Sequence, residues 1–219
     1  SGLYRVGTPI GNMEDVTLRA LFTLAKADKI ICEDTRVTGQ LLRTYGITKP
    51  LVSFHEHSGP KVLSSLVEDL KNGLLLAFVS DAGMPLISDP GYTLVQACIE
   101  NDIYMTTIPG PTAFVSALVL SGFPSHHFNF LGFFPEKNKD KELALQVQQT
   151  FQGTSIFYES PHRLLKTLQF LSQEVPTQEI CVARELTKLH ETIHRGTPQE
   201  LLAHFESQAP RGEMVLLFA

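Results

Sequence analysis

The chain has 219 residues, 43% of them hydrophobic, and its 18 basic and 23 acidic side chains give a net charge of −5. This length predicts one or two domains with a proper apolar core, and the composition excludes an intrinsically disordered chain. No apolar run approaches the roughly 18 residues of a membrane-spanning helix, and no secretory signal opens the chain. The three cysteines lie in apolar runs, so we expect buried thiols in a soluble cytoplasmic protein.

Neither half of the chain has the basic excess that marks a free nucleic-acid binder. Residues 1–111 carry 9 basic and 12 acidic side chains, and residues 112–219 carry 9 and 11. A nucleic-acid substrate would therefore have to be recognised through a local basic patch, or as part of a prepared macromolecular surface.

The first half of the chain alternates between strand and helix patterns. Strands are predicted over residues 3–7, 29–32, 51–54, 74–79 and 103–108, and helices over residues 15–27, 38–45, 61–71 and 91–100. Asp15 is the expected N-cap of the first helix and Asp89 that of the last. Because the apolar runs are continuous rather than alternating, we expect an α/β fold whose five-stranded parallel sheet has helices on both faces.

Two prolines around Gly110 interrupt this alternation and predict a hinge between an N-terminal domain, residues 1–111, and a C-terminal domain, residues 112–219. Helices are expected over residues 113–121, up to about 151, 162–171 and 198–205, and strands over residues 128–131, 155–158, 179–184, 191–195 and 213–218. A short segment joins the third and fourth of these strands, which predicts a hairpin. The second domain is therefore expected to be α+β with a mixed or antiparallel sheet.

The segments that follow the strands of the first half carry most of the informative polar side chains. Ligands of open α/β sheets bind beyond the carboxyl ends of the strands. Residues 7–12 combine glycines, which allow close backbone approach, with the hydrogen-bonding side chains of Thr8 and Asn12. This loop is neither a G-x-G-x-x-G nor a Walker sequence, which disfavours nicotinamide and nucleoside triphosphates. An ordinary strand-to-helix turn is the alternative.

The second strand ends in two acids, a hydroxyl and a guanidinium, at Glu33, Asp34, Thr35 and Arg36. Such a group suits acid–base work or phosphate binding. The alternative is a surface salt bridge with a helix N-cap.

The third strand ends near His55 and His57, whose spacing is reminiscent of a metal pair. No third ligand is close in sequence, so we predict no metal site. A histidine for proton transfer or phosphate contact is the preferred interpretation, and a solvated loop is the alternative.

The fourth strand is followed by a long loop, residues 80–91, which is opened by glycines and stiffened by prolines. Asp81 lies where the strand stops, so its carboxylate could accept hydrogen bonds from a ligand ammonium or a ribose. Loops of this composition are typically functional.

Six segments carry a resemblance that is spread in order over nearly the whole chain: residues 7–12 (GTPIGN), 33–36 (EDTR), 80–91 (SDAGMPLISDPG), 109–113 (PGPTA), 157–160 (FYES) and 183–187 (ARELT). Together they closely resemble the bacterial small-subunit ribosomal RNA cytidine-2′-O-methyltransferases, which belong to the tetrapyrrole (corrin/porphyrin) methylase superfamily. The departures are Met84, where the family usually has a small threonine, and an end at Ala219, where many relatives continue into a helical extension.

The resemblance implies S-adenosylmethionine as methyl donor in a cleft between two α/β domains, commonly within a homodimer. It also implies a ribose 2′-hydroxyl in the decoding region of 16S ribosomal RNA as acceptor. The residues that it assigns to the donor are Asp81, Ala82, Gly83, Pro85, Ile87, Thr112, Ala113, Tyr158 and Ala183.

The choice of residues for the methyl acceptor rests on chemistry as well as on the resemblance. A sulfonium methyl is already activated, so positioning supplies much of the catalysis, and a base helps a weak hydroxyl nucleophile. Glu33, Asp34 and His55 are the candidates for that base. The candidates for substrate binding are Thr8, Pro9, Asn12 and Arg36, the last as a phosphate ligand.

Two other functions remain open from the sequence. A methylase of the same fold could act on a corrin-type molecule or a protein side chain, but its acceptor loops should be apolar, whereas residues 33–36 are polar. A non-enzymatic module that binds the ribosome is the third possibility.

Overall fold

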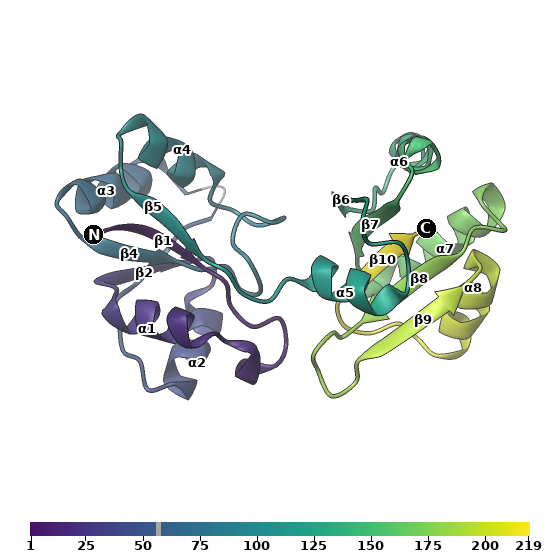
Figure 1. The fold of residues 1–219 in the computed structure, drawn as a ribbon, viewed down its shortest axis with the longest axis horizontal. Helices are drawn as coiled ribbons and strands as arrows, with labels where there is room; N and C mark the ends of the chain where they lie inside the picture. Colours follow the sequence, from purple (N-terminus) through teal and green to yellow (C-terminus); the bar gives the residue numbers. More distant parts are fainter. Residues whose placement is uncertain (56–57) are drawn as a thin grey trace. The chain divides into compact units, whose positions relative to one another are not determined.

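The computed structural model describes residues 1–55 and 58–219, which form two compact units, Ser1–Thr112 and Ala113–Ala219 (Figure 1). Within this described part, no helix is both long enough and apolar enough to cross a bilayer.

Unit 1 is built on a parallel sheet in the order β3-β2-β4-β1-β5. Its strands are β1 (Gly2–Val6), β2 (Lys29–Cys32), β3 (Leu51–Ser53), β4 (Leu75–Phe78) and β5 (Met105–Ile108). The central strands are buried on both faces, as their continuous apolar runs require. The predicted five-stranded parallel sheet is confirmed.

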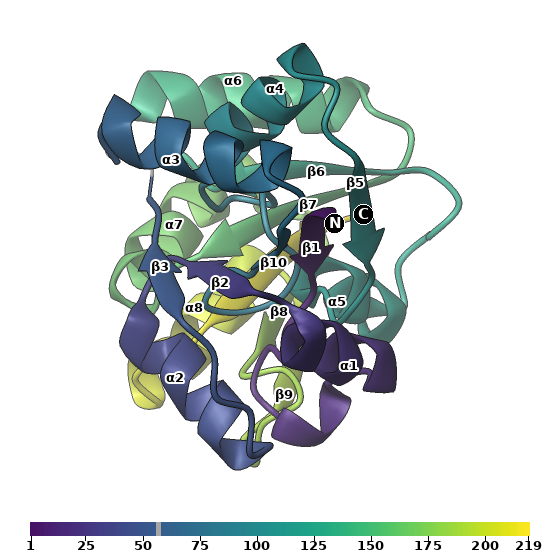
Figure 2. The same ribbon diagram turned by 90° about the vertical axis from the view of Figure 1, so that its left-hand side faces the viewer.

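Helices cover both faces of this sheet. The helices α1 (Leu18–Lys26) and α2 (Thr35–Thr44) lie on one face, and α3 (Pro60–Lys71) and α4 (Tyr92–Glu100) lie on the other (Figures 1 and 2). Strand β2 shows why two separate cores form. Ile30 and Cys32 pack with α1 and α2, whereas Ile31 between them packs with α3 and α4.

Three helix starts differ from those expected from the sequence. Asp15 does not cap α1, because residues Met13–Asp15 form a separate 3₁₀ turn, η1, and the Thr17 side chain accepts the Ala20 N–H instead. Helix α2 begins three residues earlier than predicted. Asp89 does not cap α4, since the cap is Gly91 at φ 127°, a conformation that favours glycine.

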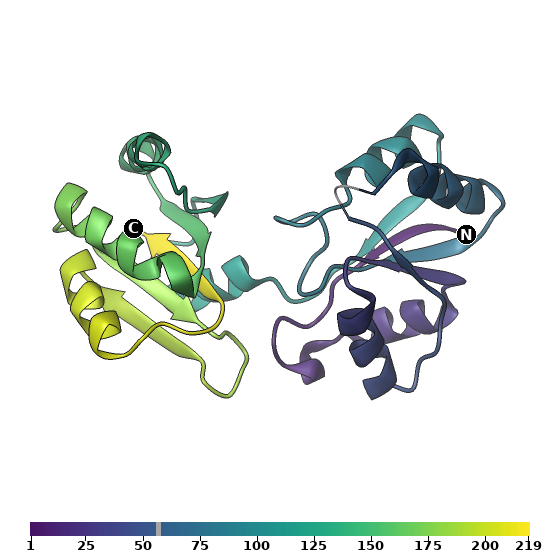
Figure 3. The ribbon, with the colours of Figure 1, turned by 180° about the vertical axis from the view of Figure 1, so that it is seen from behind.

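Unit 2 contains a second five-stranded sheet, in the order β6-β7-β10-β8-β9 (Figure 3). Its elements are α5 (Ala113–Ser121), β6 (Phe128–Phe133), α6 (Asn138–Thr150), β7 (Thr154–Glu159), α7 (Pro161–Glu174), β8 (Ile180–Arg184), β9 (Thr192–Gly196), α8 (Pro198–Ser207) and β10 (Met214–Phe218). Strands β6 and β7 are parallel and the other pairs antiparallel, which confirms the predicted mixed sheet. The β8–β9 hairpin is confirmed as well.

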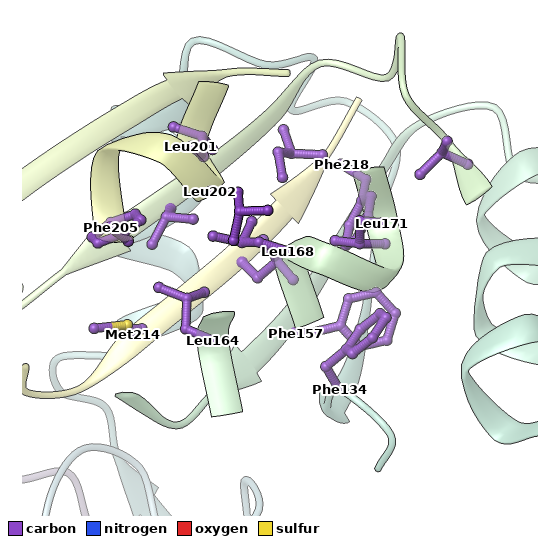
Figure 4. Packing of buried hydrophobic residues seen from close by; sticks show 14 of the residues in the cluster. Phe134, Phe157, Leu164, Leu168, Leu171, Leu201, Leu202, Phe205, Met214 and Phe218 are labelled. Atoms are coloured by element: carbon purple, nitrogen blue, oxygen red, sulfur yellow. The ribbon is translucent and has the colours of Figure 1, made fainter. Parts of the chain in front are cut away.

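The main core of unit 2 lies between its sheet and the helices α7 and α8 (Figure 4). Leu164, Leu168 and Leu171 present one apolar stripe of α7 at helical spacing, and Phe157 and Phe218 meet it from the sheet. Helix α5 contacts strands β7, β8, β9 and β10, so it supports the same sheet.

Two glycine-to-alanine substitutions in unit 1 should have opposite effects on stability. A Cβ on Gly91 would lie 2.2 Å from the Phe78 ring and would be held in left-handed backbone, so Gly91→Ala should lower the free energy of unfolding by about 2 kcal/mol or more. Gly39 lies inside α2 and has room for a methyl group. Gly39→Ala should therefore raise the free energy of unfolding by up to about 1 kcal/mol.

Urea denaturation of both variants and the wild type measures these two changes in the free energy of unfolding. A Gly91→Ala protein as stable as the wild type would contradict the packing of that residue against Phe78.

Candidate functional site

The loops after β1 and β4 are joined by a pair of backbone hydrogen bonds at the carboxyl edge of the unit 1 sheet. The Thr8 N–H donates to the Gly83 carbonyl at 2.9 Å, and the Gly83 N–H donates to the Thr8 carbonyl at 3.1 Å. The Thr8 hydroxyl is buried and donates to the Ser80 carbonyl at 3.4 Å. Thr8 therefore holds two loops together, and Gly83, at φ 77°, uses backbone that favours glycine.

A second close approach joins the loop after β1 to the segment that follows β5. A Cβ added to Gly7 would lie 2.7 Å from the Gly110 Cα and equally close to the Met84 sulfur, and one added to Gly110 would lie 2.9 Å from Gly7. Only glycine permits this contact between two backbones. Met84, the departure from the family pattern, fills the space beside it.

The loop between β4 and α4 has strained backbone. Leu86 and Ser88 adopt φ values of 72° and 62°, which residues with a Cβ rarely occupy. Strain of this kind clusters at functional sites, where the surrounding structure maintains it. Among the residues that the resemblance assigns to the donor, Ala82 and Ile87 are exposed on this loop and Pro85 is buried.

Asp34 links the ends of β2 and β4 and begins α2. Its N–H donates to the Asp81 carboxylate at 3.1 Å, and its own carboxylate accepts the Arg36 N–H at 2.8 Å as the helix cap. The Arg36 guanidinium also donates to both oxygens of Asp34, with the shortest contact at 2.5 Å. These hydrogen bonds hold the pKa of Asp34 down at about 2. Asp34 is thus a poor proton acceptor at neutral pH, although it is well suited to position Arg36.

Glu33 has the opposite electrostatic environment. Burial raises the pKa of its carboxyl group above the ordinary value, and the neighbouring Asp81 carboxylate raises it further, while the charge of His55 opposes the change. The Ser53 hydroxyl donates to the Glu33 carbonyl at 3.1 Å, which ties the end of β3 to the end of β2. Of the two carboxyl candidates for the base, Glu33 therefore has its pKa shifted upward and Asp34 has its pKa shifted downward.

Asp89 belongs to the same group of carboxylates, and its sequence position gave no sign of this. Burial raises the pKa of its carboxyl group to about 6, a hydrogen bond with the Ser80 side chain opposes the change, and Glu33 and Asp81 add to it. Local sequence suggested only a helix cap at this position. The loop folding back over the edge of the sheet is what brings Asp89 to its neighbours.

The remaining candidates at this edge have distinct surroundings. Asn12 is exposed and its side chain accepts the Glu14 N–H at 3.0 Å, so it caps η1, and Pro9 is half-buried. His55 is exposed, and its N–H donates to the Ser58 hydroxyl at 2.8 Å. His57, the other half of the apparent metal pair, lies outside the described residues, and no three potential metal ligands cluster within the described ones.

The predicted donor residues of unit 2 lie in its sheet and at the start of α5. Tyr158 packs edge-on against Phe130, with ring centroids 4.8 Å apart, and Phe130 stacks on Phe114 of α5 at 4.5 Å. Ala183 is fully buried in β8 between β9 and β10, and Ala113 is the first residue of α5. The aromatic packing around Tyr158 was missed from the sequence, although β6 is visibly rich in phenylalanine.

Together, the strand ends of unit 1 place several carboxylates, one guanidinium and one imidazole at a single edge of a parallel sheet. Such an edge can attract a cationic ligand and can accept a proton. The fold is therefore of the α/β class, and this edge is where ligands of open α/β sheets usually bind.

Comparison with known proteins gives this class a family. Residues 2–202 match the tetrapyrrole (corrin/porphyrin) methylases. The chain is 45% identical over 214 residues to ribosomal RNA small subunit methyltransferase I of Thermotoga maritima, a match that covers 98% of this chain and 96% of that protein. It is 46% identical over 215 residues to the Halalkalibacterium halodurans protein of the same name, covering 98% and 74%. A solved structure of diphthine synthase has a similar fold, with a TM-score of 0.79 at 13% identity, covering 100% of this chain and 89% of that chain.

The chain therefore belongs to the tetrapyrrole (corrin/porphyrin) methylase family.

The raised pKa of Asp89 predicts that this side chain reduces stability. An acid with a raised folded-state pKa is ionised less favourably in the folded chain, so the penalty is present above about pH 6 and absent below about pH 4. Asp89→Asn should thus raise the free energy of unfolding by about 1–2 kcal/mol at pH 8, with partial solvent screening included, and leave it unchanged at pH 4.

Urea denaturation at both pH values measures this effect. Asp102→Asn, an exposed acid at the opposite edge of the sheet, is the control and should show no such pH dependence. An Asp89→Asn protein that is less stable than the wild type at pH 8 would contradict the electrostatic assignment.

Proposed function

We propose that this protein transfers a methyl group from S-adenosylmethionine to the 2′-hydroxyl of a cytidine in the decoding region of 16S ribosomal RNA, in the bacterial cytoplasm. The observation that carries the proposal is the carboxyl edge of unit 1, where Glu33 has a raised pKa beside Asp81 while Asp34 fixes Arg36. The names of the relatives at 45% and 46% identity support methylation of small-subunit ribosomal RNA.

The residues at this edge suit the donor. S-adenosylmethionine is cationic at its sulfonium and at its ammonium group, and it supplies an activated methyl when bound. The exposed carboxylate of Asp81 can accept hydrogen bonds from such a ligand, and the small residues Ala82 and Gly83 let it approach the backbone. The resemblance also assigns Thr112, Ala113, Tyr158 and Ala183 to the donor.

On the acceptor side, Glu33 takes the proton of the ribose hydroxyl. Its raised pKa brings it closer to the pH at which a base both is ionised and binds a proton effectively. Asp34 acts through Arg36, because its carboxylate is occupied by the guanidinium and by the first turn of α2. The exposed fork of Arg36 suits a phosphate beside the acceptor nucleotide. The charge of His55 opposes the rise in the pKa of Glu33.

A second copy of the chain is the proposed partner of unit 2. Strand β6 is an edge strand whose exposed side chains include Phe128, Leu131 and Phe133, the last 55% exposed. An apolar edge of this kind is unfavourable in water unless another surface covers it. The mass of the purified chain by light scattering tests this, and a monomer at high protein concentration would contradict it.

Removal of one charge should separate donor binding from folding. Asp81→Asn keeps a hydrogen-bond acceptor for the Asp34 N–H but removes the negative charge, so the affinity for S-adenosylmethionine should fall by about 10-fold, or about 1.4 kcal/mol. Calorimetry measures the affinity, and the ligand-induced rise in melting temperature should shrink in parallel.

Asp102→Asn is again the matched control and should bind like the wild type. A wild-type protein that does not bind S-adenosylmethionine at all would overturn the proposed donor, whereas equal binding by Asp81→Asn would remove only Asp81 from the site.

Two variants should impair methyl transfer without impairing donor binding. Glu33→Gln removes the base and Arg36→Ala removes the phosphate ligand, so each should lower methyl incorporation into small ribosomal subunits by about 10-fold or more. The measurement is incorporation of labelled methyl groups at saturating donor, with donor affinity and melting temperature determined on the same samples.

Glu68→Gln, on the exposed side of α3, is the charge-matched control for Glu33→Gln. Unchanged incorporation in both site variants would exclude residues 33–36 from the acceptor site, and label found on a base rather than on a ribose would exclude 2′-O transfer.

A further inference from the structure

The two helix layers of unit 1 differ sharply in charge. Helices α1 and α2 contain four basic residues and no acidic residue: Arg19, Lys26, Arg36 and Arg43. Helices α3 and α4, on the opposite face of the same sheet, contain two basic and three acidic residues: Lys61, Lys71, Glu68, Asp69 and Glu100. The net charge of −5 therefore conceals one basic surface.

The basic side chains of α1 and α2 are available to an outside partner. Arg19 and Arg43 are exposed, and neither forms an ion pair with any residue in the described part of the chain. Lys26 lies over the Phe22 ring at 4.3 Å, and that ring is 59% exposed. Exposed arginines without ion-pair partners and an exposed aromatic ring are both typical of surfaces that bind nucleic acid.

This surface is continuous with the proposed acceptor site. Arg36 lies in the first turn of α2, two residues from Asp34, at the carboxyl edge of the sheet. At the other end of α2, the Tyr45 hydroxyl donates to the Met13 carbonyl of η1, which precedes α1 in the chain. The two helices are thus held on one side of the sheet, as Figure 2 shows.

We propose that the outer surface of α1 and α2, defined by Arg19, Lys26 and Arg43, binds phosphates of the ribosomal RNA that flanks the acceptor nucleotide. This inference rests on the proposed function, since it extends the same substrate beyond Arg36. A polyanion with one charge per nucleotide matches a surface that has repeated cations and no acid in its helices. An acidic protein segment could match the same cations, but it contains no ribose for the adjacent site to act on.

The test compares two double variants that remove the same charge from opposite faces of one sheet. Arg19→Gln/Arg43→Gln changes the proposed surface, and Lys61→Gln/Lys71→Gln changes α3. All four side chains are exposed, so melting temperatures should remain close to that of the wild type. The probes are intact small ribosomal subunits and a fragment of 16S RNA that contains the decoding region, each titrated over a range of salt concentrations.

The first double variant should bind both probes about 10-fold or more weakly at ~0.1 M salt. The slope of log K against log salt should be shallower by roughly 1.4 to 1.8, the value for two lost phosphate contacts. With intact subunits, KM should rise while kcat and donor affinity stay unchanged. The α3 variant should behave like the wild type.

Equal salt dependence in the two double variants would overturn the surface assignment. Weaker binding to subunits with unchanged binding to the RNA fragment would also overturn it, because it would indicate a ribosomal protein as the partner. Normal salt-dependent binding by a wild-type chain that transfers no methyl group would overturn the proposed function and leave the binding surface in place.

Discussion

The pairing of Thr8 with Gly83 is the contact on which the functional edge of unit 1 depends. It joins two loops whose paired residues are 75 positions apart in sequence. The buried Thr8 hydroxyl adds hydrogen bonds to the Ser80 and Gly83 carbonyls. Parallel strands place their loops at one edge but do not fix those loops against each other. Here two backbone hydrogen bonds and the contact of Gly7 with Gly110 do so, which leaves little freedom for the carboxylates that the loops carry.

This rigidity matters because the edge concentrates like charges. Burial raises the pKa of Glu33 and of Asp89, the Asp81 carboxylate raises both further, and Glu33 adds to the rise at Asp89. A chain selected for stability alone would not keep such a group. A cationic ligand would relieve the repulsion, so the same feature that destabilises the free protein favours its binding. The ionised form of Asp34 is instead stabilised, because its carboxylate accepts hydrogen bonds from the Arg36 guanidinium and from the Arg36 N–H at the start of α2.

The distribution of charge explains how an acidic protein can be suited to an RNA substrate. Acidic groups lie at the carboxyl edge and, with two lysines, in α3 and α4, whereas the helices α1 and α2 contain basic but no acidic residues. The sheet that separates the two faces is apolar on both sides, so they are electrostatically distinct surfaces of one unit. Function within a shared fold is carried by such local differences rather than by the fold itself.

The sequence alone determined those features of this protein that depend on local pattern. Continuous apolar runs predicted a doubly covered parallel sheet, and the strand-end motifs placed Glu33, Arg36 and Asp81 at one edge, because parallel strands end together. Even the resemblance to a methylase family rests on short segments whose order along the chain is visible without any structure. The lack of a basic excess in either half indicated that a nucleic-acid substrate would need either a local basic patch or a prepared macromolecular surface.

Only the tertiary structure decided what depends on residues that are distant in sequence. Asp15 and Asp89 both have the local setting of helix caps, yet Asp15 belongs to the separate turn η1 and Gly91 packs against Phe78, so Thr17 and Gly91 cap those helices. The pKa values of the carboxyl groups also depend on residues that are distant in sequence. Asp34 and Glu33 are neighbours in sequence, but the pKa of Asp34 falls because Arg36 donates hydrogen bonds to it. The pKa of Glu33 rises because the side chain is partly buried and because Asp81, from another strand end, lies near it. Electrostatic environment is a property of three-dimensional proximity, which spacing along a chain does not specify.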